Sequence, residues 1–195
     1  MKKLLLLITA LLLYTSSFGQ GLSKQAYRNS QSDWIASVGL NVLGNLGTRN
    51  PAEDLGDFSF KNPLIIGIEY RWLDFLSFEQ DIVLNGFNDG EFIDNGTLSE
   101  DIFYFSTNTN LKFYFSDYIY DANWVDLYIA TGLGIFTMEE LNTSFNVLGG
   151  VNFWVNETRT IGVRLQSAGK LAFNSDFRQY ANNHWIHSIQ ATFRL

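Results

Sequence analysis

The last twelve residues of the chain constrain its fold more than any other stretch. Residues 184–195 alternate between apolar and polar side chains as far as the final residue. A side-chain period of two predicts a β-strand with one apolar and one polar face. Chain ends usually fray, so an apolar strand at the very terminus needs a partner. A closed barrel provides one, because its last strand pairs with its first and leaves no open edge.

The same alternation recurs along most of the chain. We predict eight strands, at residues 34–42, 64–72, 76–84, 101–113, 124–136, 145–155, 161–167 and 184–195. Most of these have roughly the nine to eleven residues that cross a membrane at barrel tilt. Long connections at 44–62, 85–100 and 168–183, and a medium one at 137–144, alternate with short turns. The pattern predicts an all-β, eight-stranded antiparallel up-and-down transmembrane β-barrel, with both termini on the rim of the short turns.

The beginning of the chain has the pattern of a secretory signal peptide. Lys2 and Lys3 precede an apolar run at 4–13, and small residues follow it. The run is too short to span a bilayer core of roughly 30 Å as a helix. We therefore expect a signal peptide at 1–20, a short periplasmic tail at 21–32, and the barrel domain at 33–195.

Composition excludes several classes of function. The chain contains no Cys, so it has no disulfide, no thiolate metal site, no cysteine nucleophile and no lipoprotein anchor. Without Lys2 and Lys3, the formal net charge changes from −7 to −9. Nucleic acid requires a basic surface, so we expect no nucleic-acid partner. We also predict no cofactor.

Alternation alone does not say which face of the strands is inside. A soluble lipocalin-like barrel turns its apolar face inward around a lipid, whereas a membrane barrel turns it outward. Trp34, Trp72 and Trp185 lie on the apolar face near predicted strand ends, as in the aromatic belts of membrane proteins. Glycines recur on the polar face, where a narrow lumen has little room. We favour the membrane barrel, with a soluble periplasmic lipid binder as the alternative.

The polar face carries a matched set of charges that we predict inside the barrel. The set comprises Glu69, Glu79, Asp81 and Asp126 against Arg71, Lys112, Arg164 and Arg194. Enclosed charges must be paired, and an eight-stranded barrel is just wide enough for its own side chains. We expect a structural network of salt bridges. The alternative is a water path along these charges, which would make a narrow porin-like channel.

Taken together, these features resemble the eight-stranded outer-membrane β-barrel family, which includes the OmpA transmembrane domain and OmpX. The signal segment, the run 126–135 and the terminal Phe193, Arg194 and Leu195 carry the resemblance. It implies an outer-membrane location with extracellular long loops, and a non-enzymatic structural, adhesive or complex-forming role. Implied partners are outer-membrane lipid, lipopolysaccharide, the outer-membrane assembly machinery and a surface or secretion complex. Ile189, Phe193 and Leu195 resemble the terminal assembly signal, which here ends in Leu rather than Phe.

Catalytic candidates are few, and we predict no catalytic site. His184 and His187 are the only histidines, and His187 adjoins Ser188. Membrane-barrel lipid A deacylases place His and Ser two residues apart on one strand face, whereas adjacent residues point to opposite faces. His184 is expected near the outer rim. Glu79 and Asp81 lie one pleat apart, without a predicted cleft. A lipid-modifying enzyme remains the alternative.

The long connections are acidic. Their carboxylates are Glu53, Asp54, Asp57, Asp89, Glu91, Asp94, Glu100, Asp101, Glu139, Glu140 and Asp176. We expect a solvated rim. Asp89, Glu91 and Asp94 offer oxygen ligands of the kind that calcium prefers, but their spacing does not fit an EF-hand. We therefore predict no metal site, with divalent cations shared with lipopolysaccharide phosphates as the alternative.

Overall fold

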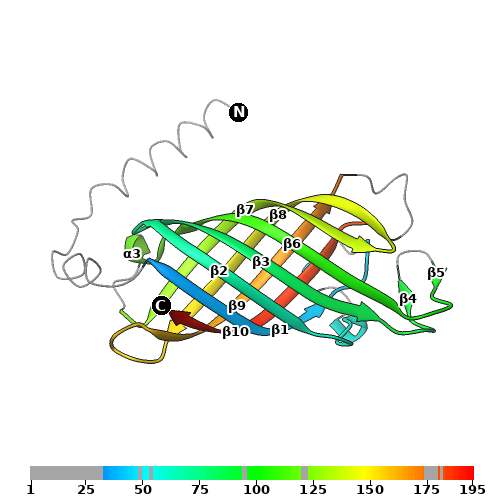
Figure 1. Cartoon of the computed structure of the whole chain (residues 1–195), viewed down its shortest axis with the longest axis horizontal. Helices are drawn as coiled ribbons and strands as arrows, with labels where there is room; N and C mark the ends of the chain where they lie inside the picture. The colour runs from blue at the N-terminus through cyan, green and yellow to red at the C-terminus, as the bar shows by residue number, and fades with distance from the viewer. Residues whose placement is uncertain are drawn as a thin grey trace.

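The computed structural model describes residues 33–47, 50–52, 55–93, 96–119, 123–173, 180 and 182–195. The expected signal peptide at 1–20 and tail at 21–32 lie outside these ranges. Eight antiparallel strands close into one barrel, which confirms the predicted fold (Figure 1). Around the wall the strands follow in the order β1, β2, β3, β6, β7, β8, β9 and β10. No helix in the described ranges is long and apolar enough to cross a membrane.

The strand bounds follow the alternation of the sequence. The barrel strands are β1 (Trp34–Leu43), β2 (Leu64–Leu73), β3 (Leu76–Phe87), β6 (Ile102–Tyr114), β7 (Val125–Met138), β8 (Glu140–Trp154), β9 (Ile161–Ala172) and β10 (His184–Arg194). A small hairpin of β4 (Phe92–Ile93) and β5 (Gly96–Thr97) lies between β3 and β6. Short helices η1 (Leu55–Asp57) and α3 (Ser116–Ile119) lie in two other connections.

Two of the predicted connections differ most from the structure in extent, and the predicted loop at 85–100 loses its first three residues to β3. The predicted loop at 137–144 is almost entirely strand, because β7 and β8 are joined at Glu139 alone. Glu139 has a φ of +71°, which reverses the chain between the paired residues Met138 and Glu140. Strand β9 likewise continues to Ala172, into the predicted loop at 168–183. Asn, Thr and Ser are frequent in turns, so their occurrence in 137–144 favoured the wrong assignment.

The β2–β3 hairpin shows how the faces stay in phase across a tight turn. The ladder pairs Leu73 with Leu76, so only Asp74 and Phe75 form the turn rather than the predicted three residues. A bulge between Arg71 and Leu73 adds the residue that the shorter turn lacks. The inward and outward faces of the two strands therefore still match.

The barrel is closed by its first and last strands. Strand β10 pairs with β1 from Ile35 opposite Arg194 to Leu43 opposite Ile186. Beyond the ladder, the Leu195 backbone N–H donates to the Trp34 carbonyl at 3.0 Å. The chain therefore uses its final residue to complete the wall.

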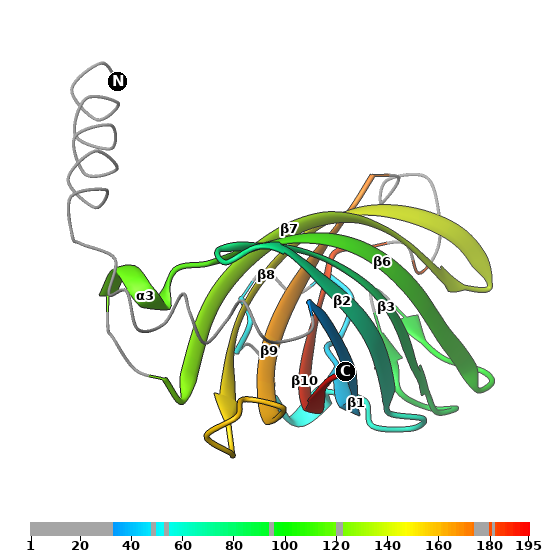
Figure 2. The ribbon, with the colours of Figure 1, turned by 60° about the vertical axis from the view of Figure 1, so that its left-hand side comes forward.

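The two ends of the barrel differ. The described residues of the connections 44–63, 88–101 and 173–183, together with Glu139, lie at one end, here called the long-loop rim. The turns 74–75 and 155–160, the described residues of 115–124 and the start of β1 lie at the other end, the short-turn rim. Figures 1 and 2 show tilted strands curving around the wall, with the β4–β5 hairpin at one end and α3 at the other. The side chains on the outside are mostly apolar and exposed, as at Ile68, Ile82, Leu111, Leu133 and Ile189.

Candidate functional site

The interior of the barrel is the candidate site, and it begins with two facing carboxylates. Glu69 on β2 lies directly opposite Glu79 on β3, and both are buried. Like charges in this position repel each other. The Arg164 guanidinium bridges them, with Nη2 at 2.6 Å from Glu69 Oε2 and Nη1 at 2.5 Å from Glu79 Oε2. Lys112 Nζ also contacts both carboxylates, at 3.2 Å from Glu69 Oε2. Residues from four strands thus form one buried ion-pair network across the lumen.

Further donors complete the hydrogen bonding of Glu69. The Tyr114 hydroxyl donates to Glu69 Oε1 at 2.6 Å, and the Ser77 hydroxyl donates to the same oxygen at 2.8 Å. A buried charge is tolerated only when it is paired and its remaining lone pairs are satisfied. The network meets this condition at Glu69.

A second group of charges surrounds Asp126 near the short-turn rim. Its carboxylate accepts from Arg71 Nη2 at 2.8 Å and from Trp154 Nε1 at 2.8 Å. Arg159, from the turn between β8 and β9, reaches the other carboxylate oxygen at 2.5 Å. A φ of +52° at Arg159 is uncommon for a residue with a side chain. The backbone of the turn therefore takes an unfavourable conformation where an arginine enters the lumen.

Asp81 and Lys170 belong to a third polar group, nearer the long-loop rim. Asp81 accepts hydrogen bonds from the side-chain amides of Asn108 at 2.5 Å and Asn110 at 2.9 Å. Lys170 Nζ donates to the side-chain oxygens of Asn108 and of Asn146, the latter at 3.3 Å. Asn108 therefore connects the carboxylate to the ammonium group, because it donates to one and accepts from the other.

The predicted balance of interior charges is wrong. Arg159 and Lys170 are also buried in the lumen, although both were assigned to connections. The described residues thus place six cations and four carboxylates inside: Arg71, Lys112, Arg159, Arg164, Lys170 and Arg194 against Glu69, Glu79, Asp81 and Asp126. Lys170 continues the inward alternation of Arg164, Gln166 and Ala168. A predicted strand that extended beyond residue 167 would therefore have placed Lys170 in the lumen. Arg159 lies in a turn, where side-chain period carries no signal.

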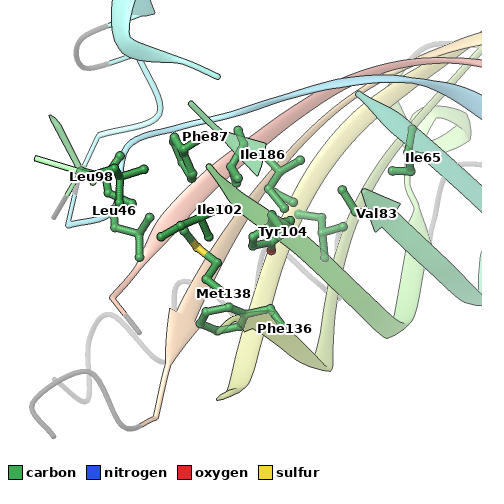
Figure 3. Close-up of a cluster of buried hydrophobic side chains, with 14 of the residues drawn as sticks. Leu46, Ile65, Val83, Phe87, Leu98, Ile102, Tyr104, Phe136, Met138 and Ile186 are labelled. Atoms are coloured by element: carbon green, nitrogen blue, oxygen red, sulfur yellow. The ribbon is translucent and has the colours of Figure 1, made fainter. Parts of the chain in front are cut away.

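Above the polar groups the lumen is filled by apolar side chains (Figure 3). This apolar plug contains the buried residues Leu43, Leu46, Ile65, Val83, Phe87, Ile93, Leu98, Ile102, Tyr104, Ala130, Phe136, Met138, Leu148, Ala168 and Ile186. Some project from the strands, whereas Leu46, Ile93 and Leu98 come from the connections of the long-loop rim. The predicted polar face therefore does not line the whole interior. In the sequence, Val83 is an apolar residue at an inward position of β3 and marks this departure.

These layers leave little free space in the lumen. A cavity of about 10 Å³ remains between the polar groups and the apolar plug, lined by residues such as Asp81, Asn146, Lys170 and Ile186. That volume accommodates about one water molecule. The side chains of the described residues therefore fill the lumen at this level of the barrel.

Solved structures of other proteins have the same architecture. Ail of Yersinia pestis matches with a TM-score of 0.52 and 11% identity, covering 85% of this chain and 99% of Ail. Neisserial surface protein A matches with a TM-score of 0.54 and 12% identity, covering 83% of this chain and 96% of that protein. OprG of Pseudomonas aeruginosa matches with a TM-score of 0.55 and 12% identity, covering 85% of this chain and 97% of OprG. The chain has the fold of the eight-stranded outer-membrane β-barrels. No protein-family model and no curated protein matches the sequence. A further structure of Ail contains the heparin analogue sucrose octasulfate.

Within this outer-membrane barrel fold, His184 begins β10 at the long-loop end, as predicted, but its side chain does not face the membrane interface. It is buried in the lumen, with its ring 4.9 Å from that of Phe136. Its Nδ1 lies 3.0 Å from the Asn182 carbonyl, which can only accept, so Nδ1 carries the proton. Nε2 then accepts from the Tyr104 hydroxyl at 2.9 Å. Both ring nitrogens have structural partners.

His187 and Ser188 point to opposite sides of the barrel wall. The His187 ring stacks on Phe58 outside the barrel, at 5.1 Å between centroids, and its Nε2 donates to the Pro51 carbonyl at 2.7 Å. Ser188 is buried in the lumen, where its hydroxyl accepts from Gln190 at 2.9 Å. The two side chains therefore do not form a nucleophile and base pair.

An ion pair joins two described residues of the acidic long-loop rim. Lys61 Nζ lies 2.6 Å from Asp101, whose carboxylate also accepts from the Asp89 backbone N–H at 2.9 Å. The hydrogen bond from Lys61, followed by that from Asp89, lowers the pKa of Asp101 below its ordinary value. Among described residues, no group of three or more His, Asp or Glu is placed to hold a metal ion. Asp94, one of the three carboxylates considered above as calcium ligands, lies outside the described residues.

The three residues of the predicted terminal assembly strand share the outer face of the barrel. Ile189, Phe193 and Leu195 are exposed by 52%, 40% and 65%. They alternate with Gln190, Thr192 and Arg194, which face the lumen. The outer edge of the last strand therefore presents an apolar row, whose role in assembly stays a prediction.

Proposed function

We propose that this protein is a non-conducting, non-enzymatic outer-membrane barrel that anchors a binding surface formed by its long-loop rim. The observation that carries the proposal is the closed lumen, in which the apolar plug covers the buried ion-pair network. A channel needs a continuous polar path, and the apolar plug interrupts it. We therefore propose that the barrel serves as an anchor, which positions its two rims at the two surfaces of the membrane.

The outer wall supports residence in a lipid bilayer. Aromatic side chains gather outside near the short-turn rim, where Trp34 contacts Tyr70 and Trp124 stacks on Phe153, at 4.9 Å and 5.9 Å between ring centroids. Phe103 and Phe173 lie outside near the opposite rim. Two such belts around an apolar band are typical of membrane barrels. We propose that the short-turn rim is periplasmic and the long-loop rim extracellular.

The charge of the long-loop rim favours one kind of partner. Its described carboxylates are Asp57, Asp89, Glu91, Glu100, Asp101, Glu139 and Glu140. Lys61 is the one lysine or arginine among the described residues of these connections, and it already pairs with Asp101. Complementary charge steers association, so the rim favours a cationic protein surface in an adhesive or complex-forming role. The polyanion bound in the Ail structure is of the opposite kind.

Orientation and location can be tested together, because the native chain contains no cysteine. Asn88→Cys introduces a thiol at the long-loop rim, and Asp74→Cys introduces a matched one at the short-turn rim, both at exposed positions. In intact cells, a membrane-impermeant maleimide should label position 88 and leave position 74 unlabelled until the outer membrane is opened. Labelling of position 74 alone would contradict the proposed orientation. Equal labelling of both in a soluble fraction would contradict the membrane location.

Outer-membrane lipid, including lipopolysaccharide, is then the partner of the wall, and the assembly machinery is the partner of the last strand. We propose that the row of Ile189, Phe193 and Leu195 acts in assembly because it is apolar, outward-facing and at the closing seam. Phe193→Ala should slow insertion into the membrane without removing a lumen contact. Phe78→Ala, an outward aromatic on β3, is the matched control and should not slow insertion. Equal insertion rates for both variants would contradict this role.

A further inference from the structure

A patch of polar side chains interrupts the apolar outer wall of the barrel. Gln80 on β3 and both Thr107 and Thr109 on β6 lie at outward positions, away from the two rims. The outward neighbours of Gln80 along β3 are Phe78 and Ile82, which are apolar and exposed. Polar groups in an apolar environment cost free energy unless they are hydrogen-bonded. In a membrane, this polar patch therefore needs partners that plain hydrocarbon chains do not supply.

The side chains of the polar patch satisfy one another only in part. Gln80 Nε2 donates to the Thr107 hydroxyl at 2.7 Å, and the Thr109 hydroxyl donates to Gln80 Oε1 at 2.5 Å. The Thr107 hydroxyl in turn donates to the Asp81 carbonyl at 3.0 Å. A side-chain amide has two N–H donors and an oxygen with two lone pairs. One donor and one acceptor of Gln80 therefore have no partner among the described residues.

The polar patch forms one end of a groove on the outer wall, here called the wall groove. The groove has a volume of about 430 Å³ and continues from Gln80 past Leu133 and Ile135 on β7 to Phe173. Phe173 lies beside β8 near the long-loop rim, where its backbone N–H donates to the Thr143 carbonyl at 3.1 Å. Three strand spacings of about 4.8 Å separate β3 from β8, so the groove is roughly 14 Å long. Its length and its apolar middle suit an aliphatic chain.

We propose that the wall groove binds an aliphatic chain that carries a hydroxyl group part-way along its length. A hydroxyl both donates and accepts, so it satisfies the remaining acceptor and donor of Gln80 together. The apolar part of the chain packs on Leu133 and Ile135, and its polar end lies at the membrane surface beside Phe173. A second copy of the protein fits less well, because a two-fold interface at this site places one groove against another. The inference rests on the membrane location proposed above.

NMR titration of the protein in phosphatidylcholine nanodiscs tests the site, with 12-hydroxystearic acid as the probe and stearic acid as its match without the hydroxyl. The Gln80 side-chain amide reports the hydrogen bond, and the methyl groups of Leu133 and Ile135 report occupancy in every variant. We expect 12-hydroxystearic acid to bind about fivefold more tightly than stearic acid, as one net hydrogen bond provides. Gln80→Leu should abolish this preference. Thr131→Val, which changes an outward threonine of β7 outside the groove, is the matched control and should keep it.

The outcomes separate this site from the membrane location on which it rests. Heat-modifiable gel mobility verifies that each variant is folded. Equal binding of the two acids by inserted native protein, or a retained preference in folded Gln80→Leu, would overturn the site and leave the membrane location intact. Gln80 signals that shift with protein concentration in the absence of fatty acid would identify a second copy as the occupant and would also overturn the proposal. A protein that does not enter nanodiscs would contradict the membrane location and this site together.

Discussion

Glu69 and Glu79 face each other directly across the β2–β3 ladder, and one arginine from the far wall binds both. Arg164 lies on β9, so its two ion pairs cross the lumen and hold opposite sides of the barrel together. The same two carboxylates bind Lys112 from β6. The ion-pair network therefore links strands that are not neighbours in the wall.

Removal of Arg164 should destabilise the barrel strongly. Arg164→Met leaves two facing carboxylates with Lys112 alone, and breaking a buried ion pair costs about 3–5 kcal/mol. Urea unfolding in lipid vesicles measures the loss. Arg164→Met combined with Glu79→Gln should recover part of it, because the double variant removes one of the repelling charges. A loss below about 1 kcal/mol, as for an exposed pair, would contradict a buried network.

Truncation within the apolar plug should reduce stability without opening a pore. Phe136 is fully buried beside Tyr104 and His184, and Phe→Ala changes in a core cost about 3–5 kcal/mol. The ion-pair network below the plug remains in Phe136→Ala and still blocks the lumen. Urea unfolding should show the loss, and planar-bilayer recordings should stay silent. The outward Phe103→Ala is the matched control, with a much smaller change in the free energy of unfolding.

The Lys61–Asp101 ion pair at the long-loop rim should stabilise the fold less as the pH falls. The Lys61 hydrogen bond lowers the folded-state pKa of Asp101, so its stabilising contribution is present above the ordinary carboxyl pKa. The contribution is lost as pH falls through the lowered pKa. Carbon NMR titration of the Asp101 carboxyl group should show the low value in the native protein and a rise in Lys61→Gln. An identical titration curve in both proteins would mean that the ion pair does not persist in solution.

The acidic rim should select cationic ligands. Combined Gln substitutions at Glu100, Glu139 and Glu140 should weaken adhesion to polylysine-coated surfaces, and the effect should fade at high salt. Substitutions of Asp74 and Glu157 at the short-turn rim are the control and should not change adhesion in oriented membranes. The native protein should bind heparin poorly, because like charges repel. Tight heparin binding would contradict the proposed partner class.

Lipid modification should be absent. His187 lies outside the wall and Ser188 inside it, so no proton transfer between the two side chains is possible in this arrangement. Purified protein incubated with lipopolysaccharide should release no fatty acid in mass spectrometry. If fatty acid were released, and if His187→Ala or Ser188→Ala abolished that release, the non-enzymatic proposal would fail.

The sequence predicts the strands of the barrel wall better than the side chains that fill the lumen. Side-chain period follows from the backbone alone, so residues such as Ile189 and Gln190 are assigned correctly to opposite faces. The sequence does not show how far the polar lumen extends. The burial of His184 was missed because nothing in its local pattern shows that Tyr104, eighty residues away, supplies a partner. Arg159 was missed because turn geometry, rather than period, directs it inward.

Single-channel conductance in planar bilayers tests the closed barrel most directly. Refolded protein, verified by heat-modifiable gel mobility, should insert without discrete current steps, while a known porin conducts under the same conditions. A silent membrane with inserted protein agrees with a lumen filled by the ion-pair network and the apolar plug. Reproducible single-channel steps from the native protein would contradict the account and would favour the narrow pore.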